Sequence, residues 1–276
     1  MKYVVGVLAV VVSAQVVADS DCKYEAERYH SADLDGVREV HIEVGAGDLR
    51  VIGGAQQGLQ ATGQACAGTE EQLAELNLRG ERVGDVYELH SMHPDDQGWS
   101  LGWRNKVQRI DVAVELPEGI DVVIKDSSGS MLVRNVGNAH ITDSSGDMRI
   151  EMAVDLDIQD SSGDIEVRNA QSVVLSDSSG SIEVTQAGSV LVENDSSGDI
   201  EFSQIADARI INDSSGDIDI RDVRGDVIVE RDSSGSISAR DVEGDFIVER
   251  DSSGGIRFER VAGNVVTPED SRRKLK

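Results

Sequence analysis

The tetrapeptide Asp-Ser-Ser-Gly occurs eight times after residue 125 of this 276-residue sequence, at almost equal spacing. Successive copies start 17 to 19 residues apart, and the step lengthens slowly from the first copy to the last. A fixed period of this size predicts a solenoid, because a single repeat can bury its apolar side chains only by stacking on its neighbours. The eight copies begin at Asp126, Asp143, Asp160, Asp177, Asp195, Asp213, Asp232 and Asp251.

Each repeat also holds two short segments in which apolar and polar residues alternate. In one repeat Ile165 and Val167 precede Ala170, and Val173 and Leu175 follow it. Alternation with a period of two is typical of strands that bury one face, so Ala170 marks a corner between two strands. Parallel crossover connections are overwhelmingly right-handed. We therefore predict an all-β fold, a right-handed parallel β-solenoid (β-helix) of about nine coils of 17 to 19 residues.

The first of these coils is expected at residues 109–125, which keep the apolar spacing without the tetrapeptide. An antiparallel β-sandwich is the competing all-β fold. That fold would not explain why every corner carries the same four residues.

The sequence divides into four parts. A positive charge at Lys2, an apolar run and then small residues indicate a secretory signal peptide. A region unlike the coils follows, and Thr69-Glu70-Glu71-Gln72 within it is a capping box that predicts a short helix through Leu76. An open solenoid end exposes unpaired strands, so this region is expected to cap it. The parts are a signal peptide at 1–18, an N-terminal cap at 19–108, the β-solenoid at 109–267 and a disordered tail at 268–276.

The sequence has two cysteines, Cys22 and Cys66, and both follow the expected signal peptide. Exported proteins fold in an oxidising compartment, so the two thiols are expected to form one disulfide. The periplasm is the favoured location, with the cell surface or secretion as alternatives. No later stretch reaches the ~20 apolar residues of a transmembrane helix.

The net charge of the chain is -26. Nucleic acid is therefore a poor partner, because neutralising phosphates needs clustered lysines and arginines. An envelope protein or a glycan remains possible as a partner, and so does a divalent cation.

The tetrapeptide itself is open to two interpretations. Asp and Ser accept backbone hydrogen bonds in turns and Gly supplies a positive φ, so the repeat is first of all a good corner. Stacked coils would also align eight aspartates into one column, which could gather calcium through its oxygens. Calcium-binding nonapeptide repeats, however, place two glycine turns in each coil. We favour the structural interpretation, expect no cofactor or bound metal, and keep calcium as the alternative.

Two further functional alternatives remain. Trp99 and Trp103 alternate onto one face of a short segment, where they form a partner-binding patch or a lid over the solenoid end. A carbohydrate-active enzyme on a β-helix would need long loops around a cleft, and the corners are uniformly short. The sequence predicts no catalytic residues, and we expect a non-enzymatic protein.

The recurrent segment Ser-Ser-Gly-Asp-Ile-x-Val, at residues 161–167 and 214–220, has a degenerate copy in Gly47-Asp48-Leu49-Arg50-Val51. In this the chain resembles a family of exported bacterial proteins known as putative adhesins of unknown function, from about residue 37 to residue 267. The resemblance implies a β-strand repeat and adhesin-like or structural binding of an unknown ligand. It implies no catalytic residues.

Overall fold

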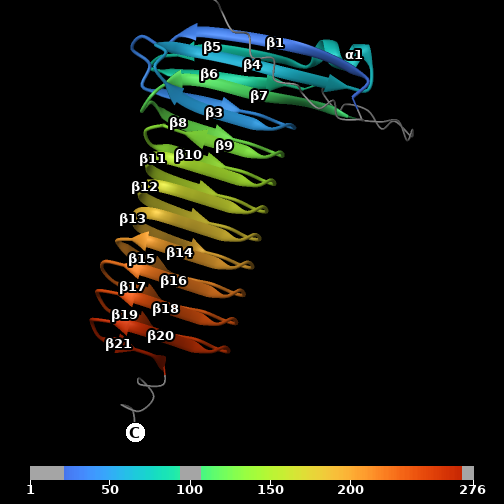
Figure 1. The fold of residues 1–276 in the computed structure, drawn as a ribbon. Coiled ribbons are helices and arrows are strands. Elements are labelled where there is room, and N and C mark those ends of the chain that lie inside the picture. Colours follow the sequence, from blue (N-terminus) through green and yellow to red (C-terminus); the bar gives the residue numbers. More distant parts are fainter. Residues whose placement is uncertain (1–21, 94–106, 269–276) are drawn as a thin grey trace, which may run out of the picture.

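The repeated tetrapeptide forms one corner of every coil in the computed structural model, which describes residues 22–93 and 107–268. The coils stack along one axis into a rod of about eight turns, with a wider layer of strands at its N-terminal end (Figure 1). Eight is one coil fewer than the sequence suggested. The right-handed winding stays a prediction.

Each coil contributes one strand to each of two sheets. We call the sheet that follows the tetrapeptide corner the first face, and the sheet that precedes the next tetrapeptide the second face. The first face holds β9 (Met131–Arg134), β14 (Ile200–Ile205), β16 (Ile218–Val223), β18 (Ile237–Val242) and β20 (Ile256–Val261). The second face holds β8 (Asp121–Lys125), β10 (Ala139–Thr142), β15 (Asp207–Ile210), β17 (Val227–Val229), β19 (Phe246–Val248) and β21 (Val265–Val266). Three long strands bend from the first face to the second: β11 (Met148–Gln159), β12 (Ile165–Ser176) and β13 (Ile182–Asn194).

Neighbouring coils pair in parallel, with like residues above like residues. Ile165 lies opposite Ile182, and Val173 lies opposite Val190. This register confirms the parallel solenoid and contradicts an antiparallel sandwich for the repeats. Side chains at the predicted inward positions are buried: Ile165, Val167, Ala170, Val173 and Leu175 are at most 8% exposed.

The glycine of each tetrapeptide lets the coils approach closely at their first corner. Gly216 has a φ of 136°, which residues with a side chain rarely adopt. A Cβ atom built there would lie 1.6 Å from the carbonyl oxygen of Gly198 in the preceding coil. Both the backbone conformation and the coil spacing therefore require glycine.

The opposite corner is made by a residue in the left-handed region that is not glycine. Asn169 has a φ of 58°, and the residue nine positions after each tetrapeptide Asp repeats this conformation. Asn and Asp tolerate it best, but Met152, Gln186 and Arg260 also adopt it. The bend is therefore imposed by the stacked strands rather than by the residue type alone.

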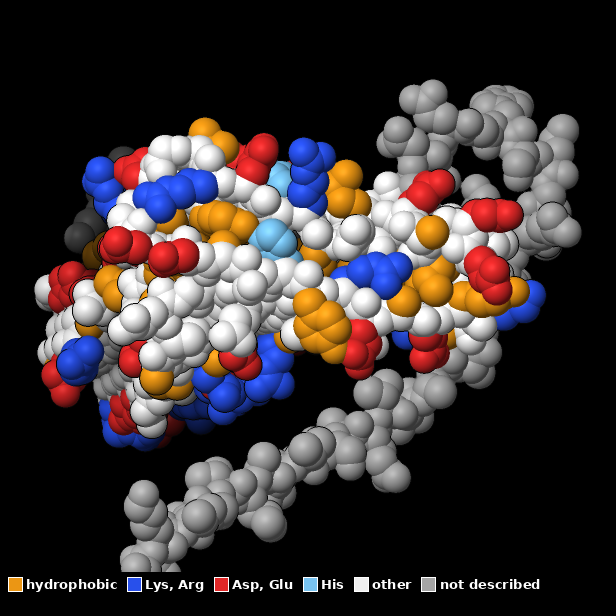
Figure 2. All heavy atoms as spheres, turned by 90° about the horizontal axis from the view of Figure 1, so that it is seen from above, with side chains coloured by type: hydrophobic (Ala, Val, Ile, Leu, Met, Phe, Trp, Pro, Cys, Tyr) orange, Lys and Arg blue, Asp and Glu red, His pale blue; other side chains and the backbone are white. Residues whose placement is uncertain are grey.

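The N-terminal end is closed by antiparallel strands. On the first face β4 (Gly58–Ala67) pairs antiparallel with both β1 (Tyr24–Asp33) and β7 (Gln108–Pro117). On the second face β5 (Asn77–Val83) pairs antiparallel with β6 (Val86–Met92). Seen from above, this end shows hydrophobic, acidic and basic side chains interspersed (Figure 2). The cap thus ends the apolar interior of the rod in a mixed polar surface.

The degenerate repeat near residue 48 forms a coil that is inserted into the stack. It consists of β2 (Glu39–Glu43) and β3 (Leu49–Gly54). β3 pairs in parallel with β7 on one side and β9 on the other, while β2 lies between β6 and β8. Strands β7 and β9 are therefore separated by a strand that comes more than fifty residues earlier in the chain. The spacing of the repeats in the sequence could not predict that β3 lies between β7 and β9.

The predicted helix and disulfide both lie in the cap. Helix α1 (Glu70–Glu75) begins at Thr69, whose hydroxyl accepts the backbone N–H of Gln72 at 3.2 Å. The guanidinium of Arg28 donates to the carbonyl oxygens of Leu73 and Leu76 at the end of the helix. In residues 22–93 and 107–268 no helix is long and apolar enough to cross a membrane.

A disulfide joins Cys22 to Cys66, with the two Cα atoms 5.5 Å apart. It ties the start of β1 to β4, the strand with which β1 pairs. The disulfide expected from the sequence is therefore present.

Candidate functional site

The eight tetrapeptide aspartates form the column that the repeat predicted, but seven of their side chains point into the wall of the solenoid. Asp195 and Asp213 have no exposed surface, and Asp160, the most accessible of the seven, is 6% exposed. Asp251 in the last coil is partly exposed. The seven buried members are Asp126, Asp143, Asp160, Asp177, Asp195, Asp213 and Asp232.

One oxygen of six of the seven buried carboxyl groups, all except that of Asp232, shapes its own corner. The Oδ1 atom of Asp126 accepts the backbone N–H groups of Ser127 at 2.7 Å and Ser128 at 3.3 Å. Asp143, Asp160 and Asp177 repeat both contacts. These are the turn hydrogen bonds expected of Asp followed by Ser, and they stabilise the corner.

The second oxygen lies buried without a protein partner among the described residues in every one of the seven. Burial disfavours the charged form, and the carboxylates of neighbouring coils add to this effect. Burial, then the charges of adjacent aspartates, raises the pKa of Asp126 and of Asp213 to about 7. Burial is also the main cause that raises the pKa of Asp160, Asp195 and Asp232 to about 6, and the charges of neighbouring aspartates add to it. At Asp160 the hydrogen bond from the backbone N–H of Ser161 opposes this rise in pKa and outweighs the charge of either neighbouring aspartate.

The serine hydroxyls connect one coil to the next. The Oγ of Ser145 donates to the carbonyl oxygen of Ser127 at 3.2 Å, and Ser162 donates in the same way to Ser144 at 3.1 Å. Every later coil repeats the contact. A serine side chain thus links each of these coils to the coil before it.

Two further columns of aspartate have a structural role that the sequence did not reveal. On the first face, Oδ1 of Asp164 accepts the backbone N–H of Ser181, one coil later, at 2.9 Å. On the second face, Oδ1 of Asp226 accepts the N–H of Asp245 at 2.8 Å. The same contact is made by Asp121, Asp147, Asp199, Asp207, Asp217 and Asp245. In the sequence, only the recurrence of Asp at a spacing of one coil could have indicated this role.

No group of three or more His, Cys, Asp or Glu side chains in the described part of the chain is arranged to hold a metal ion. Six of the seven buried carboxyl groups of the tetrapeptide column present one oxygen to backbone amides, and all seven bury the other. Their arrangement fits proton binding and corner formation. Calcium takes six or more oxygen ligands, and the expectation that none is bound stays a prediction.

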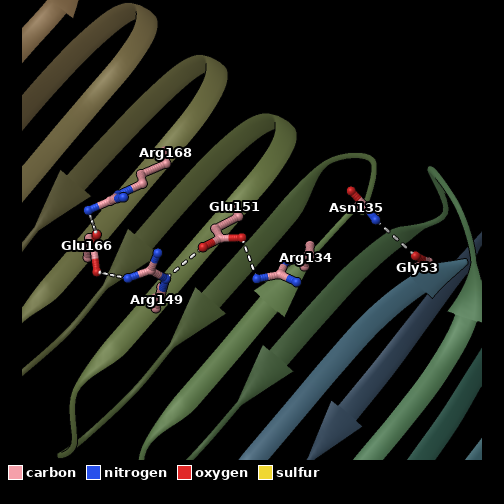
Figure 3. A network of polar contacts seen from close by, with 7 residues as sticks. All are labelled: Gly53, Arg134, Asn135, Arg149, Glu151, Glu166 and Arg168. Carbon is pink, nitrogen blue, oxygen red and sulfur yellow. Dashed lines mark hydrogen bonds and ion pairs between the residues drawn. The ribbon is translucent and has the colours of Figure 1, made fainter.

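Charged side chains form a ladder along the outer surface of the first face (Figure 3). Glu151 lies between Arg134, at 2.6 Å, and Arg149, at 2.7 Å. Arg149 also contacts Glu166 of the next coil at 2.6 Å, and Glu166 pairs with Arg168. The hydrogen bond from Arg149 is the main cause that lowers the pKa of Glu151. The ladder joins three coils, although exposed pairs of this kind contribute little stability.

The second face carries a different column on its outer surface. Val174 lies next to Leu191, Leu191 next to Arg209, and Ile228 next to Ile247. The four aliphatic side chains are partly exposed, and Arg209 is exposed. Arg209 interrupts the series and pairs with Glu230. We call the aliphatic members the apolar column: Val174, Leu191, Ile228, Ile247 and Val266.

A shallow depression of about 370 Å³ crosses β4, β7, β3 and β9, where the cap joins the solenoid. Its two acids are already engaged, since Oδ1 of Asp48 accepts the N–H of Ser130 at 2.9 Å and Oδ1 of Asp111 accepts the N–H of Asp48 at 3.0 Å. Both carboxylates of the depression therefore already accept a hydrogen bond from the backbone. The predicted tryptophan patch, Trp99 and Trp103, lies outside the described residues.

No protein-family model matches the chain, and no curated protein sequence matches it. Solved structures do share its fold. A putative adhesin from Parabacteroides distasonis is 13% identical with a TM-score of 0.52, and the match covers 85% of this chain and 97% of that one. A putative lipid binding protein from the same species is 16% identical with a TM-score of 0.49, covering 87% of this chain and 97% of the other. A putative adhesin from Parabacteroides merdae is 10% identical, with a TM-score of 0.44 over 89% and 97% of the two chains.

At these identities the likeness concerns the fold alone. A protein described as a putative adhesin is among those that share it, in agreement with part of the resemblance seen in the sequence. The link through the Ser-Ser-Gly-Asp-Ile motif stays a prediction.

Proposed function

We propose that the chain is an exported, non-enzymatic, adhesin-like protein that binds an envelope partner through the second face of its solenoid. The observation that carries the proposal is the apolar column. Ile228 and Ile247 lie in register on a rigid sheet and remain partly exposed. Ile228, Ile247 and Val266 follow one another without a polar residue between them, and adjacent exposed apolar side chains are typical of sites that contact a partner.

The chemistry of the second face favours a protein partner over a glycan. Sugar-binding surfaces commonly use aromatic rings, and the described solenoid, residues 107–268, contains three aromatic residues: Phe202, Phe246 and Phe258. Phe202 and Phe246 are fully buried. The aliphatic column fits an extended or helical segment of another protein.

The acid columns support a non-enzymatic role. A glycoside hydrolase of the usual kind needs two carboxyl groups that flank one bond in a cleft. The aspartates that repeat along this solenoid instead accept backbone N–H groups, either in their own corner or one coil later. The Cys22–Cys66 disulfide supports export, because disulfides persist in oxidising compartments.

A quantitative pull-down tests the proposal. The mature chain would be used to capture proteins from the envelope fraction of its host, followed by mass spectrometry. Ile228→Asn with Ile247→Asn should reduce the captured partner about tenfold, since burial of such anchors dominates interface energies. The control, Asp219→Asn with Ser238→Asn, changes outward positions of the first face in the same two coils. Equal capture by both double variants would contradict the proposal, and capture of nothing by the wild type would favour a spacer.

A further inference from the structure

Among the described residues, no strand covers the apolar interior of the rod beyond the C-terminal coil, and Thr267 and Pro268 line a hollow there with Phe258. In the described residues β20 pairs only with β18, and β21 only with β19. Phe258 of β20 is 51% exposed, whereas Ala239, its partner one coil earlier, is fully buried. Ile256, Val261 and Val265 pack against the core and are only partly buried. A solenoid end of this kind offers both apolar surface and free strand edges.

Among the described residues, the N-terminal end offers no matching apolar layer, although β1 and β5 there also pair with one strand each. There the interior is covered by β1, β4, β5 and α1, and Leu59, Leu76 and Leu78 are buried beneath them. Head-to-tail stacking of copies would place this apolar layer against the mixed polar surface of the cap. A second copy of the chain matches the open coil in apolar character with its own last coil, around a two-fold axis.

The outward residues of β20 suit such a contact. If two copies of Ile256–Val261 pair antiparallel about Phe258, Arg257 of each copy lies opposite Glu259 of the other. Opposite charges directly across an antiparallel pair are stabilising, whereas like charges are destabilising. The two phenylalanines would meet at the centre, where an offset or edge-to-face aromatic pair stabilises the contact beyond the effect of the area that it buries. The strand is thus complementary to itself in charge and in shape.

We propose that two copies of the chain join tail to tail through their last coils, by antiparallel pairing of β20 with β20 of the second copy. Both sheets of the rod continue across the junction, and the free edges and the apolar layer of both copies are covered. The resulting particle is about twice as long as one chain and carries a cap at each end. This goes beyond the proposed partner binding, because the contact uses the end of the rod and leaves the second face free.

The test measures the mass of the full chain by sedimentation over a range of concentrations, with scattering measurements of its length. The wild type should dimerise and its longest dimension should about double. Arg257→Glu and Glu259→Arg, each alone, place like charges opposite one another at two symmetric positions and should weaken dimerisation about tenfold. The double variant Arg257→Glu/Glu259→Arg should restore it, although Arg260 now lies beside a second basic residue.

A matched control is Arg224→Glu, which makes the same charge change at an exposed position two coils earlier. It should leave the dimer unchanged. Far-ultraviolet circular dichroism and the melting midpoint would show that each variant is folded. A wild type that is monomeric at every concentration overturns the proposal, whether residues 269–276 or a strand of another protein occupies the end. A dimer that both single charge reversals leave intact overturns it too.

Discussion

The backbone of Asp213 pairs with the backbone of Asp232 in the next coil, so two buried carboxyl groups are stacked one above the other in the solenoid wall. Burial first, and then the charges of Asp195 and Asp232, raises the pKa of Asp213 to about 7. Burial, and then the charge of Asp251, raises the pKa of Asp232 to about 6. The corner that builds the rod therefore also binds protons near neutral pH.

This arrangement predicts that the protein is more stable at mildly acidic pH than at pH 8. Each aspartate whose pKa is raised on folding contributes stability that is complete below its unfolded pKa of 3.8 and is lost as the pH rises through 6 to 7. Each such proton changes the free energy of unfolding by about 1.4 kcal/mol per pH unit. Urea unfolding between pH 4.5 and pH 8 should show a falling midpoint. A midpoint that rises with pH would contradict the prediction.

The variant Asp213→Asn distinguishes the effect of the buried aspartates on stability from the effect of the large net negative charge of the chain. The amide oxygen can still accept the N–H of Ser215, which lies 3.2 Å from Oδ1 of Asp213, and the amide nitrogen can donate to an unpartnered Oδ2 of a neighbouring coil. The variant should be more stable than the wild type at pH 8, by about 1 kcal/mol or more, and should lose this advantage near pH 4.5. Asp219→Asn, an exposed position in the same coil, serves as the control. Parallel pH profiles for the two variants would refute the role of the column.

Two glycines, one inside a tetrapeptide and one just after the last tetrapeptide, provide a test of the corner geometry. Gly216→Ala puts a Cβ atom 1.6 Å from a backbone oxygen at a φ of 136°, so the variant should lose about 3 kcal/mol or more of unfolding free energy. A Cβ atom built at Gly255 would have no other atom within 4 Å, and the φ of Gly255 is not in the left-handed region. Gly255→Ala should therefore change stability by less than about 1 kcal/mol. Thermal melts of both variants would suffice. Similar losses at both positions would show that coil spacing does not depend on the tetrapeptide glycine.

Much of the fold follows from the sequence because a solenoid repeats its own local chemistry. Inward Ile165 and Val167 and the glycine corner recur in every coil, so one repeat gives the strand pattern and the stacking direction of all. The inserted coil of β2 and β3 could not be foreseen in the same way. Its pairing with β7 and β9 joins segments far apart in the chain, and no local periodicity encodes such contacts.

The orientation of the aspartate column was the main feature that the sequence left open. A carboxylate at a corner can point to solvent or into the wall, and the pattern of Asp followed by Ser is compatible with both. The buried Oδ2 atoms of Asp195 and Asp213 depend on the coil spacing, which a single repeat does not specify. The roles of Asp164 and Asp226 as acceptors from the next coil depend on the same spacing.

The disulfide should contribute strongly to the stability of the cap. Cys22 and Cys66 are separated by 44 residues, and closing a loop of that size stabilises a fold by about 4 kcal/mol in the chain-entropy model. Cys22→Ser with Cys66→Ser should lower the melting midpoint, with early loss of protection in hydrogen exchange for β1 and β4. The coils after β12 should keep their protection, because they pair only with neighbouring coils. Uniform loss of protection along the rod would contradict this.

Calcium should leave the stability of the protein unchanged. In the tetrapeptide column, Oδ1 of Asp126 accepts two serine amides and Oδ2 is buried, so neither oxygen is presented to a hydrated cation. A specific site with a Kd of about 10 μM would add about 2.7 kcal/mol at 1 mM calcium, which a thermal melt detects easily. Melts with calcium, with magnesium and with a chelator at equal ionic strength make the comparison. A midpoint that rises several degrees with calcium alone, and falls again with chelator, would establish a site that these aspartates do not account for.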